Sequence, residues 1–315
     1  MHCLNVKLTY DCSNRCSFCF SSHLHSLQPS SSSILSAIEE GSSKGCRELV
    51  LSGGEPTLVP DSVVSAMENA ERLGYTKYIV QTNGFGLASK ESMLFRFLAS
   101  FSRRSEVCVS FSIHGHTAEK HDAMCSNRGA FKSLLNAVRN ISGTDCRIYT
   151  NTVVSSLNMS HLREIAELVL PFNPNIIQFA IGKAERKTLW DSVEKLIKRR
   201  HQVAPSPLST RLVETAQAIR CLGRTGLVPE SILRTEGIPF CLMHGFEHCV
   251  GESYWPNQLD LLTCNDKYLE DFSQIDSGMR WKAPNCGRCI MNCICPGIWK
   301  EHAREFCDAN IRPIA

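Results

Sequence analysis

Three cysteines with a short, regular spacing follow an apolar segment near the start of the chain. Cys12, Cys16 and Cys19 form a CxxxCxxC pattern directly after residues 4–10. Three thiolates this close together favour a metal, and iron–sulfur clusters are held by cysteine thiolates. A zinc knuckle or a set of chance thiols is the alternative. However, a structural zinc site needs four closed ligands and usually opens with CxxC. A triplet without a nearby fourth Cys or His predicts a [4Fe–4S] cluster with one iron open to a substrate or second cofactor.

A second motif stands at the end of the next apolar segment. Residues 47–57 read Arg-Glu-Leu-Val-Leu-Ser-Gly-Gly-Glu-Pro-Thr, so a strand pattern runs directly into Gly53, Gly54 and Glu55. Glycines allow the backbone to approach a ligand closely, and Glu55 adds a carboxylate at the same place. One short motif carries a real false-positive risk. Two motifs in order, each following a strand, are far more specific.

Together the two motifs resemble the signature of the radical S-adenosylmethionine (SAM) superfamily. The resemblance implies that the three cysteines are catalytic and bind a [4Fe–4S] cluster, whose open iron chelates SAM. It also implies that the reduced cluster cleaves SAM to a 5′-deoxyadenosyl radical, which abstracts a hydrogen atom from the substrate. Phe18 corresponds to the aromatic position that packs against adenine. The Gly53-Gly54-Glu55 motif corresponds to the residues that bind the SAM ammonium.

Four further polar residues are expected to face the cofactor from strand ends. Thr82 and Asn83 belong to a Thr-Asn-Gly triplet that resembles the third-strand motif of the superfamily. Ser112 stands where relatives carry a polar residue for the methionine or ribose part of SAM, and Asn151 lies within a predicted strand. For each residue the alternative is a role in capping backbone groups. Three histidines also follow the fourth strand, in a predicted polar loop: His114, His116 and His121.

The elements that must position these residues alternate between strand and helix patterns. Six apolar segments are predicted strands: residues 4–10, 49–52, 78–81, 107–113, 147–154 and 176–181. Helical spacings of apolar residues fill the intervals. This alternation predicts an α/β fold with a parallel sheet and helices outside, closed by right-handed crossovers into a partial (β/α)6 TIM-like barrel, as the resemblance also implies. Ligands of such barrels bind at the C-terminal ends of the strands, where the motifs above stand.

The C-terminal part of the chain is rich in cysteine, with eight of the 17 cysteines between Cys241 and Cys307. Its CxxC and the cysteines around it resemble the auxiliary-cluster modules called SPASM and twitch. The resemblance implies one auxiliary [4Fe–4S] cluster on four cysteines: Cys241, Cys286, Cys289 and Cys295. A second cluster would use four others: Cys249, Cys264, Cys293 and Cys307. However, Trp299 stands where the SPASM spacing expects a cysteine, and a zinc site is the alternative.

We therefore expect a radical SAM barrel core over residues 1–184, a helical connecting region over 185–237 and an auxiliary-cluster domain over 238–315. The resemblance implies an enzyme that modifies a side chain of a ribosomal peptide or protein, or alternatively one that oxidises or rearranges a small molecule. It also implies a flavodoxin- or ferredoxin-type electron donor. A non-catalytic iron–sulfur or zinc protein and an RNA modifier are the remaining alternatives.

Composition limits the other classes of protein. The net charge of +3 is nearly neutral, so no nucleic acid partner is expected. No apolar run reaches the length of a membrane span, and Lys7 and Asp11 interrupt any signal-peptide core. A cytoplasmic location with metal-bound cysteines is therefore expected rather than disulfides. The scattered cysteines are predicted to be small buried residues: Cys3, Cys46, Cys108, Cys125, Cys146 and Cys221.

Overall fold

The computed structural model describes the larger part of the chain: residues 2–19, 21, 24, 28–182, 211–253, 258–261, 269–271, 278, 280–303 and 313–314. Cys264, Cys307 and residues 185–210 of the expected connecting region lie outside these residues. Within the described ranges, no helix combines the length and the apolar composition needed to cross a membrane.

A curved sheet forms the centre of the molecule, with strand order β7-β6-β5-β4-β3-β2-β1-β8-β9. Neighbouring strands are parallel from β7 through to β8, and β9 is antiparallel to β8. The strands are β1 (His2–Thr9), β2 (Cys46–Gly53), β3 (Lys77–Thr82), β4 (Glu106–Ser112), β5 (Arg147–Val154), β6 (Ile176–Ile181), β7 (Leu233–Glu236), β8 (Gln258–Leu261) and β9 (Leu269–Asp271).

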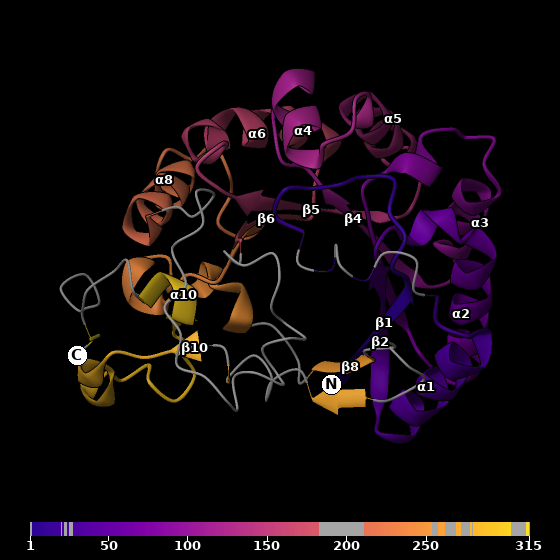
Figure 1. Ribbon diagram of the computed structural model, residues 1–315, viewed down its shortest axis with the longest axis horizontal. Helices are drawn as coiled ribbons and strands as arrows, with labels where there is room; N and C mark the ends of the chain where they lie inside the picture. The colour runs from indigo at the N-terminus through magenta and orange to yellow at the C-terminus, as the bar shows by residue number, and fades with distance from the viewer. Residues whose placement is uncertain are drawn as a thin grey trace.

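Helices form an outer arc around the sheet (Figure 1). They are α1 (Ser31–Ser43), α2 (Pro60–Arg72), α3 (Met93–Phe101), α4 (Ala118–Cys125), α5 (Ala130–Ile141), α6 (Leu162–Val169) and α8 (Leu212–Arg224). Local sequence sets where several of them begin, since the Ser30 and Ser92 side chains accept hydrogen bonds from the first turns of α1 and α3. The C-terminal region adds a small hairpin of β10 (Arg280–Trp281) and β11 (Ile298–Trp299), followed by α10 (Lys300–Ala303).

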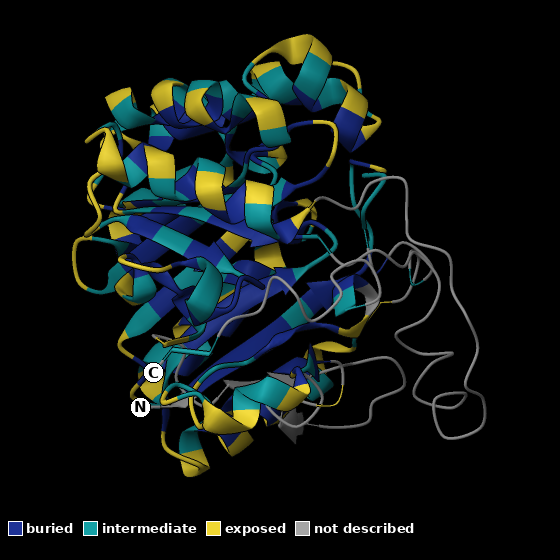
Figure 2. Ribbon diagram, turned by 90° about the vertical axis from the view of Figure 1, so that its left-hand side faces the viewer, coloured by how far each residue is buried: buried dark blue, intermediate teal, exposed yellow. Residues whose placement is uncertain are grey.

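The core lies between the sheet and the helices (Figure 2). Alternate strand residues such as Leu4, Val6 and Phe111 are fully buried there. Because side chains alternate between the two faces of a strand, the intervening residues face the concave side. One of them, Lys7, donates from Nζ to Ser52 Oγ across β1 and β2 at 2.8 Å. The concave side is therefore partly polar, and the helices are held by the opposite face.

The structure confirms the predicted α/β fold and the six predicted strands. Two expectations need correction. Residues 233–236 are not part of a helical connection, because they form β7 beside β6. The C-terminal region also contributes β8, which lies parallel to β1 and extends the barrel sheet. The predicted polar loop after β4 contains α4, whose first turn is capped by Thr117.

Candidate active site

The cysteine triplet lies on a loop that follows β1, here called the triplet loop (residues 10–19). The end of β2 holds its first residues, because Gly54 N donates to Thr9 O at 2.6 Å and Glu55 N donates to Asp11 O at 2.8 Å. Gly53 has a φ of 130°, and a Cβ on either Gly53 or Gly54 would overlap a backbone oxygen of this loop. The two glycines therefore permit close approach of β2 to the triplet loop. Their predicted contact with SAM stays a prediction.

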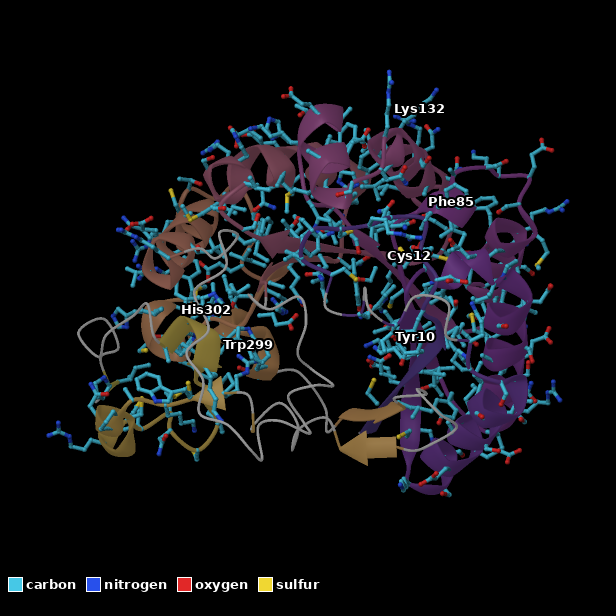
Figure 3. The ribbon with its side chains drawn as sticks, viewed as in Figure 1. Tyr10, Cys12, Phe85, Lys132, Trp299 and His302 are labelled. Atoms are coloured by element: carbon cyan, nitrogen blue, oxygen red, sulfur yellow. The ribbon has the colours of Figure 1, made fainter. Side chains whose placement is uncertain are left out.

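The C-terminal end of α4 holds the other side of the triplet loop. Arg15 N donates to Cys125 O at 2.8 Å, and Ser17 N donates to Met124 O at 3.1 Å. The side-chain amide of Asn127 donates to the loop backbone at 3.1 Å. The loop is thus fixed between β2 and α4, and Cys12 lies on the concave side of the sheet (Figure 3).

Glu55 is a buried carboxylate that joins the ends of β2 and β3. Its Oε1 accepts from Thr57 N (3.0 Å), Thr57 Oγ1 (2.7 Å) and Thr82 Oγ1 (2.6 Å). Its Oε2 accepts from Asn83 N at 2.6 Å. Burial raises the pKa of Glu55, and these hydrogen bonds act in the opposite direction. Thr82 directs its hydroxyl to Glu55, and its predicted contact with the cofactor stays a prediction. It supports the carboxylate that is predicted to bind SAM.

Asn83 connects the end of β3 to the triplet loop. Its Nδ2 donates to Ser13 Oγ at 2.9 Å and lies 3.7 Å from Cys12 Sγ, and Asn14 N lies 3.4 Å from the same sulfur. Burial raises the pKa of Cys12 to about 12, so this thiol needs a nearby positive charge such as iron in order to ionise. Hydrogen-bond donors directed at the sulfur suit a cluster thiolate. This donor set fits the predicted iron–sulfur ligand.

Ser112 and Asn151 lie in one row of residues across the sheet. Ser112, at the end of β4, is the register partner of Asn151 in β5, which pairs with Gln178 in β6. Gln178 Nε2 donates to Glu236 Oε2 at 2.9 Å and lies 3.5 Å from Asn151 Oδ1. Gln178 and Glu236 are not among the predicted site residues. The only signal in the sequence is that Gln178 interrupts an otherwise apolar strand, and Glu236 has no such signal because β7 lacks an apolar pattern.

Two histidines form a buried layer next to the triplet loop. His114 is 3% exposed and His121 is not exposed at all, and the His114 ring lies edge-on to Phe18, with ring centroids 4.7 Å apart. His114 Nδ1 accepts from Val153 N at 3.2 Å, and His121 Nδ1 accepts from His114 N at 3.2 Å. Burial lowers the pKa of His114 to about 3 and that of His121 to about 4. Both rings are therefore neutral near pH 7, with the proton on Nε2.

These two histidines make the stability of the protein depend on pH. A histidine in the unfolded chain has a pKa near 6.5, so the unfolded state takes up protons first as the pH falls. We expect the melting temperature to decrease as the pH is lowered from about 6.5 to 4, and less steeply in His121→Gln. Calorimetry across this range measures the slope, with exposed His244→Gln as the control. Equal slopes for His121→Gln and the unmodified protein would contradict the assignment.

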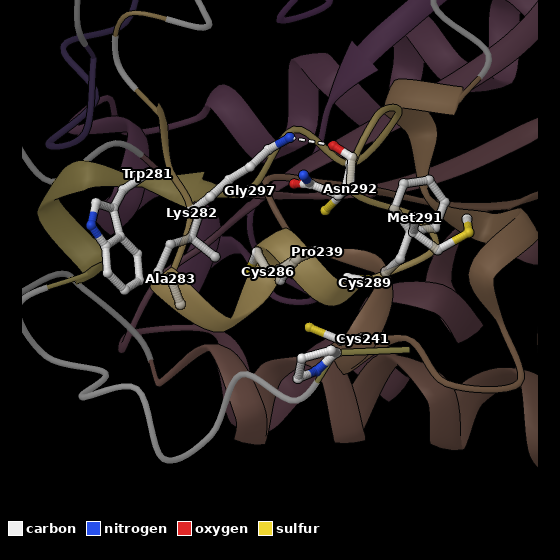
Figure 4. Close-up of a pocket in the computed structure, with 14 residues that line it drawn as sticks. Pro239, Cys241, Trp281, Lys282, Ala283, Cys286, Cys289, Met291, Asn292 and Gly297 are labelled. Atoms are coloured by element: carbon white, nitrogen blue, oxygen red, sulfur yellow. Dashed lines mark hydrogen bonds between the residues drawn. The ribbon is translucent and has the colours of Figure 1, made fainter. Parts of the chain in front are cut away.

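The four cysteines predicted to bind an auxiliary cluster line one cavity (Figure 4): Cys241, Cys286, Cys289 and Cys295. Most of the remaining wall is apolar, including Phe240, Trp281 and Met291. Ile314 N donates to Cys289 Sγ at 3.3 Å, which again places a backbone donor at a candidate ligand. Cysteines from two separate segments thus meet as a four-thiol set. The arrangement fits one four-cysteine cluster.

The cysteines considered for a second auxiliary cluster are placed differently. Cys249 is buried, with Sγ 3.8 Å from the Glu230 carbonyl oxygen, and Cys293 is exposed. Trp299, at the position where the SPASM spacing has a cysteine, is 3% exposed, and the Arg280 guanidinium stacks 3.4 Å from its ring centroid. Neither Cys249 nor Cys293 lines the four-thiol cavity. Cys264 and Cys307, the other two cysteines of that set, lie outside the described residues, so the number of auxiliary clusters stays a prediction.

The described residues also bear on the zinc alternative. Among them, no three His, Cys, Asp or Glu side chains converge closely enough to hold a single metal ion. Zinc draws four ligands around one ion, whereas each iron of a cubane takes one thiolate, so the ligands of a cubane lie further apart. Metal analysis of the purified protein distinguishes a cluster from zinc at each cysteine set.

Comparison with known proteins identifies the family of the chain. Residues 6–169 match the family described as the radical SAM superfamily. The AdoMet-dependent heme synthase of Methanosarcina barkeri is 30% identical over 131 residues, which are 42% of this chain and 35% of that protein. The match thus spans about a third of the relative's length.

Two groups of solved structures share the fold over nearly the whole chain. One is anSMEcpe with bound AdoMet, with a TM-score of 0.64 and 13% identity, covering 99% of this chain and 93% of that one. The other is SuiB of Streptococcus suis bound to S-adenosylmethionine, with a TM-score of 0.64 and 13% identity, covering 99% and 76%. At this level of identity the likeness establishes the fold alone.

Proposed function

Because the chain belongs to the radical SAM superfamily, we propose that it cleaves SAM reductively at a [4Fe–4S] cluster bound by Cys12, Cys16 and Cys19, and abstracts a hydrogen atom from its substrate. One observation carries the proposal: the Glu55–Asn83 network and α4 hold the triplet loop at the C-terminal ends of the strands. When bound, the cluster would supply the electron that breaks the sulfonium bond. The protein positions the reactants and excludes water.

The residues around the cluster have separate proposed roles. Oε2 of Glu55 accepts one protein hydrogen bond within the described part of the chain, which leaves acceptor capacity for the SAM ammonium. Asn83 orients Cys12 through its side-chain amide. Phe18 offers an aromatic face for adenine, with its ring held by His114. Ser112 and Asn151 lie in the row that continues toward Gln178, so we place them toward the SAM ribose and the substrate.

For the substrate we propose a side chain of a peptide or protein. The partly polar row of Ser112, Asn151, Gln178 and Glu236 suits a polar substrate. The four-cysteine cavity suits an auxiliary cluster that binds substrate or takes up an electron after hydrogen abstraction. Two proteins of similar fold have been solved with peptides, namely anSMEcpe with Cp18Cys peptide and SuiB with precursor peptide SuiA. A flavodoxin- or ferredoxin-type protein in the cytoplasm is the proposed electron donor.

Oxidation or rearrangement of a small molecule is the second candidate. The match to an AdoMet-dependent heme synthase favours it. Deuterium transfer distinguishes the candidates: deuterated peptides and deuterated porphyrins are each incubated with the reduced enzyme and SAM, and 5′-deoxyadenosine is analysed by mass spectrometry. Deuterium from a peptide supports the first candidate. Deuterium only from a porphyrin overturns it in favour of the second.

Replacing Glu55 by Gln tests the proposed contact with SAM. The change removes the negative charge, and charge-assisted hydrogen bonds contribute about 1.5–3 kcal/mol. We expect the Kd for SAM to rise about tenfold to a hundredfold, with iron content unchanged. Equilibrium binding to the reconstituted protein measures the Kd. The control is Glu48→Gln at the other end of β2, where the carboxylate binds Lys77. Equal SAM affinity in Glu55→Gln and the unmodified protein would show that Glu55 has only a structural role.

A further inference from the structure

A fourth thiol lies beside the triplet loop, outside every motif of the sequence analysis. Cys125 is the last residue of α4 and is 1% exposed. Its carbonyl oxygen accepts from the N–H of Arg15, the residue before Cys16, which is one of the three predicted cluster ligands. Cys125 is predicted to be a small buried apolar residue. It is buried, and its sulfur lies 3.4 Å from His121 Nε2.

The direction of the hydrogen bonds around Cys125 follows from the tautomer of His121. His121 Nδ1 accepts from the backbone N–H of His114, so the ring proton is on Nε2. That Nε2 lies 3.4 Å from Cys125 Sγ, so His121 donates to the sulfur. The S–H of Cys125 then remains available to donate to its neighbour Cys16. The observed contacts run from the backbone of His114 through His121 to Cys125.

The backbone fixes the geometry of this chain. Arg15 and Ser17, on either side of Cys16, donate to the carbonyl oxygens of Cys125 and Met124 at 2.8 and 3.1 Å. The helix ends directly afterwards, at Ser126 with a φ of 49°. Two backbone hydrogen bonds therefore hold Cys16 next to the end of α4, where Cys125 lies. Movement of the triplet loop away from α4 would break both backbone hydrogen bonds.

We propose that Cys125 and His121 are positioning residues of the cluster, which donate a hydrogen bond to the Cys16 thiolate and thereby raise the reduction potential of the cluster and slow its loss. The inference rests on the proposed function, since it requires a cluster on Cys12, Cys16 and Cys19. A donor to a ligand sulfur stabilises the more negative, reduced state, and hydrogen bonds to sulfur are one determinant of cluster potential. Partners of this kind typically change metal affinity by about tenfold or more when they are removed.

The test compares four variants of the full-length, anaerobically reconstituted protein. Cys125→Ala removes the donor, Cys125→Ser restores a hydroxyl donor, and His121→Phe removes the donor to Cys125. The control is Cys146→Ala, a buried thiol whose Sγ lies 3.7 Å from the Leu98 carbonyl oxygen, just before β5 begins. Potentiometric titration monitored by electron paramagnetic resonance follows the signal that changes on SAM addition. Iron release to a chelator is measured in parallel.

We expect Cys125→Ala to shift the potential to a more negative value and to release iron about tenfold faster. His121→Phe should shift it in the same direction by less, Cys125→Ser should lie nearer the unmodified protein, and Cys146→Ala should not differ. If Cys125→Ala does not fold, the reduction potentials and iron-release rates of His121→Phe and Cys125→Ser are compared with those of the unmodified protein, and this comparison tests the inference. Unchanged potential and iron release in the folded Cys125 and His121 variants would overturn the inference. Absence of any SAM-responsive signal in the unmodified protein would instead overturn the proposed function.

Discussion

Replacing Cys12, Cys16 or Cys19 by Ala is expected to reduce the formation of 5′-deoxyadenosine to background. A cluster that must leave one iron open for SAM has three protein ligands, so the loss of any one removes the site. The sulfur of Cys12 lies 3.4 Å from Asn14 N and 3.7 Å from Asn83 Nδ2. We expect no other described residue to replace it as a cluster ligand. Chromatography with mass spectrometry of the reconstituted, dithionite-reduced variants measures the product.

Cys46→Ala is the matched control for this prediction. Cys46 is fully buried at the start of β2, at the opposite end of the sheet from the triplet loop. It should lower stability slightly and leave SAM cleavage intact. Undiminished 5′-deoxyadenosine formation in all three triplet variants would contradict the assignment of the reaction to this loop.

The second large effect is expected from the four-cysteine cavity of the C-terminal region. Changing any one of Cys241, Cys286, Cys289 or Cys295 to Ala should lower the iron content by about four per chain, one cubane. The walls of the cavity should loosen with it, because metal binding and folding are coupled. The triplet loop uses other residues, so these variants should still cleave SAM without substrate but fail to convert the substrate. Iron and sulfide analysis measures the loss of the cluster, and the cleavage assay measures whether SAM is still cleaved.

The other C-terminal cysteines provide the control for that experiment. Cys249 binds the Glu230 carbonyl and Cys293 is exposed, so changing either to Ser should alter the iron content little. A loss of about four irons on changing either one would establish a second auxiliary cluster. Zinc in a triple variant of Cys12, Cys16 and Cys19, in place of iron, would make the C-terminal site structural.

Much of the fold could be predicted because strand and helix periodicities are strong in the barrel. The six predicted strands are apolar at alternate or successive positions, and the first four end at or near residues of a recognisable motif. β7 was missed because its four residues, Leu233–Glu236, include Arg234 and Glu236 and lack an apolar pattern. Pairing with β6 makes it a strand, and that long-range contact is not visible in a short window.

The sequence predicts cluster ligands, but it does not indicate the residues that support them. The spacing of Cys12, Cys16 and Cys19 is local and therefore visible in the sequence. α4 has little amphipathic pattern, so the burial of His121 and Cys125 against the triplet loop depends on a contact more than a hundred residues along the chain. Thr82 likewise looks like a cofactor contact in sequence, and only the fold shows that its hydroxyl meets Glu55. Supports of this kind arise from tertiary packing rather than from motif spacing.

The most direct test of the central claim is electron paramagnetic resonance of the reduced, reconstituted protein with and without SAM. A protein with Cys286 and Cys289 both changed to Ala removes the auxiliary signal, so that only a cluster on Cys12, Cys16 and Cys19 remains. If one iron of that cluster is open and binds SAM, the reduced spectrum should change on SAM addition, and the change should be lost when Cys16 is also replaced. A reduced cluster whose spectrum is the same with saturating SAM would contradict the account.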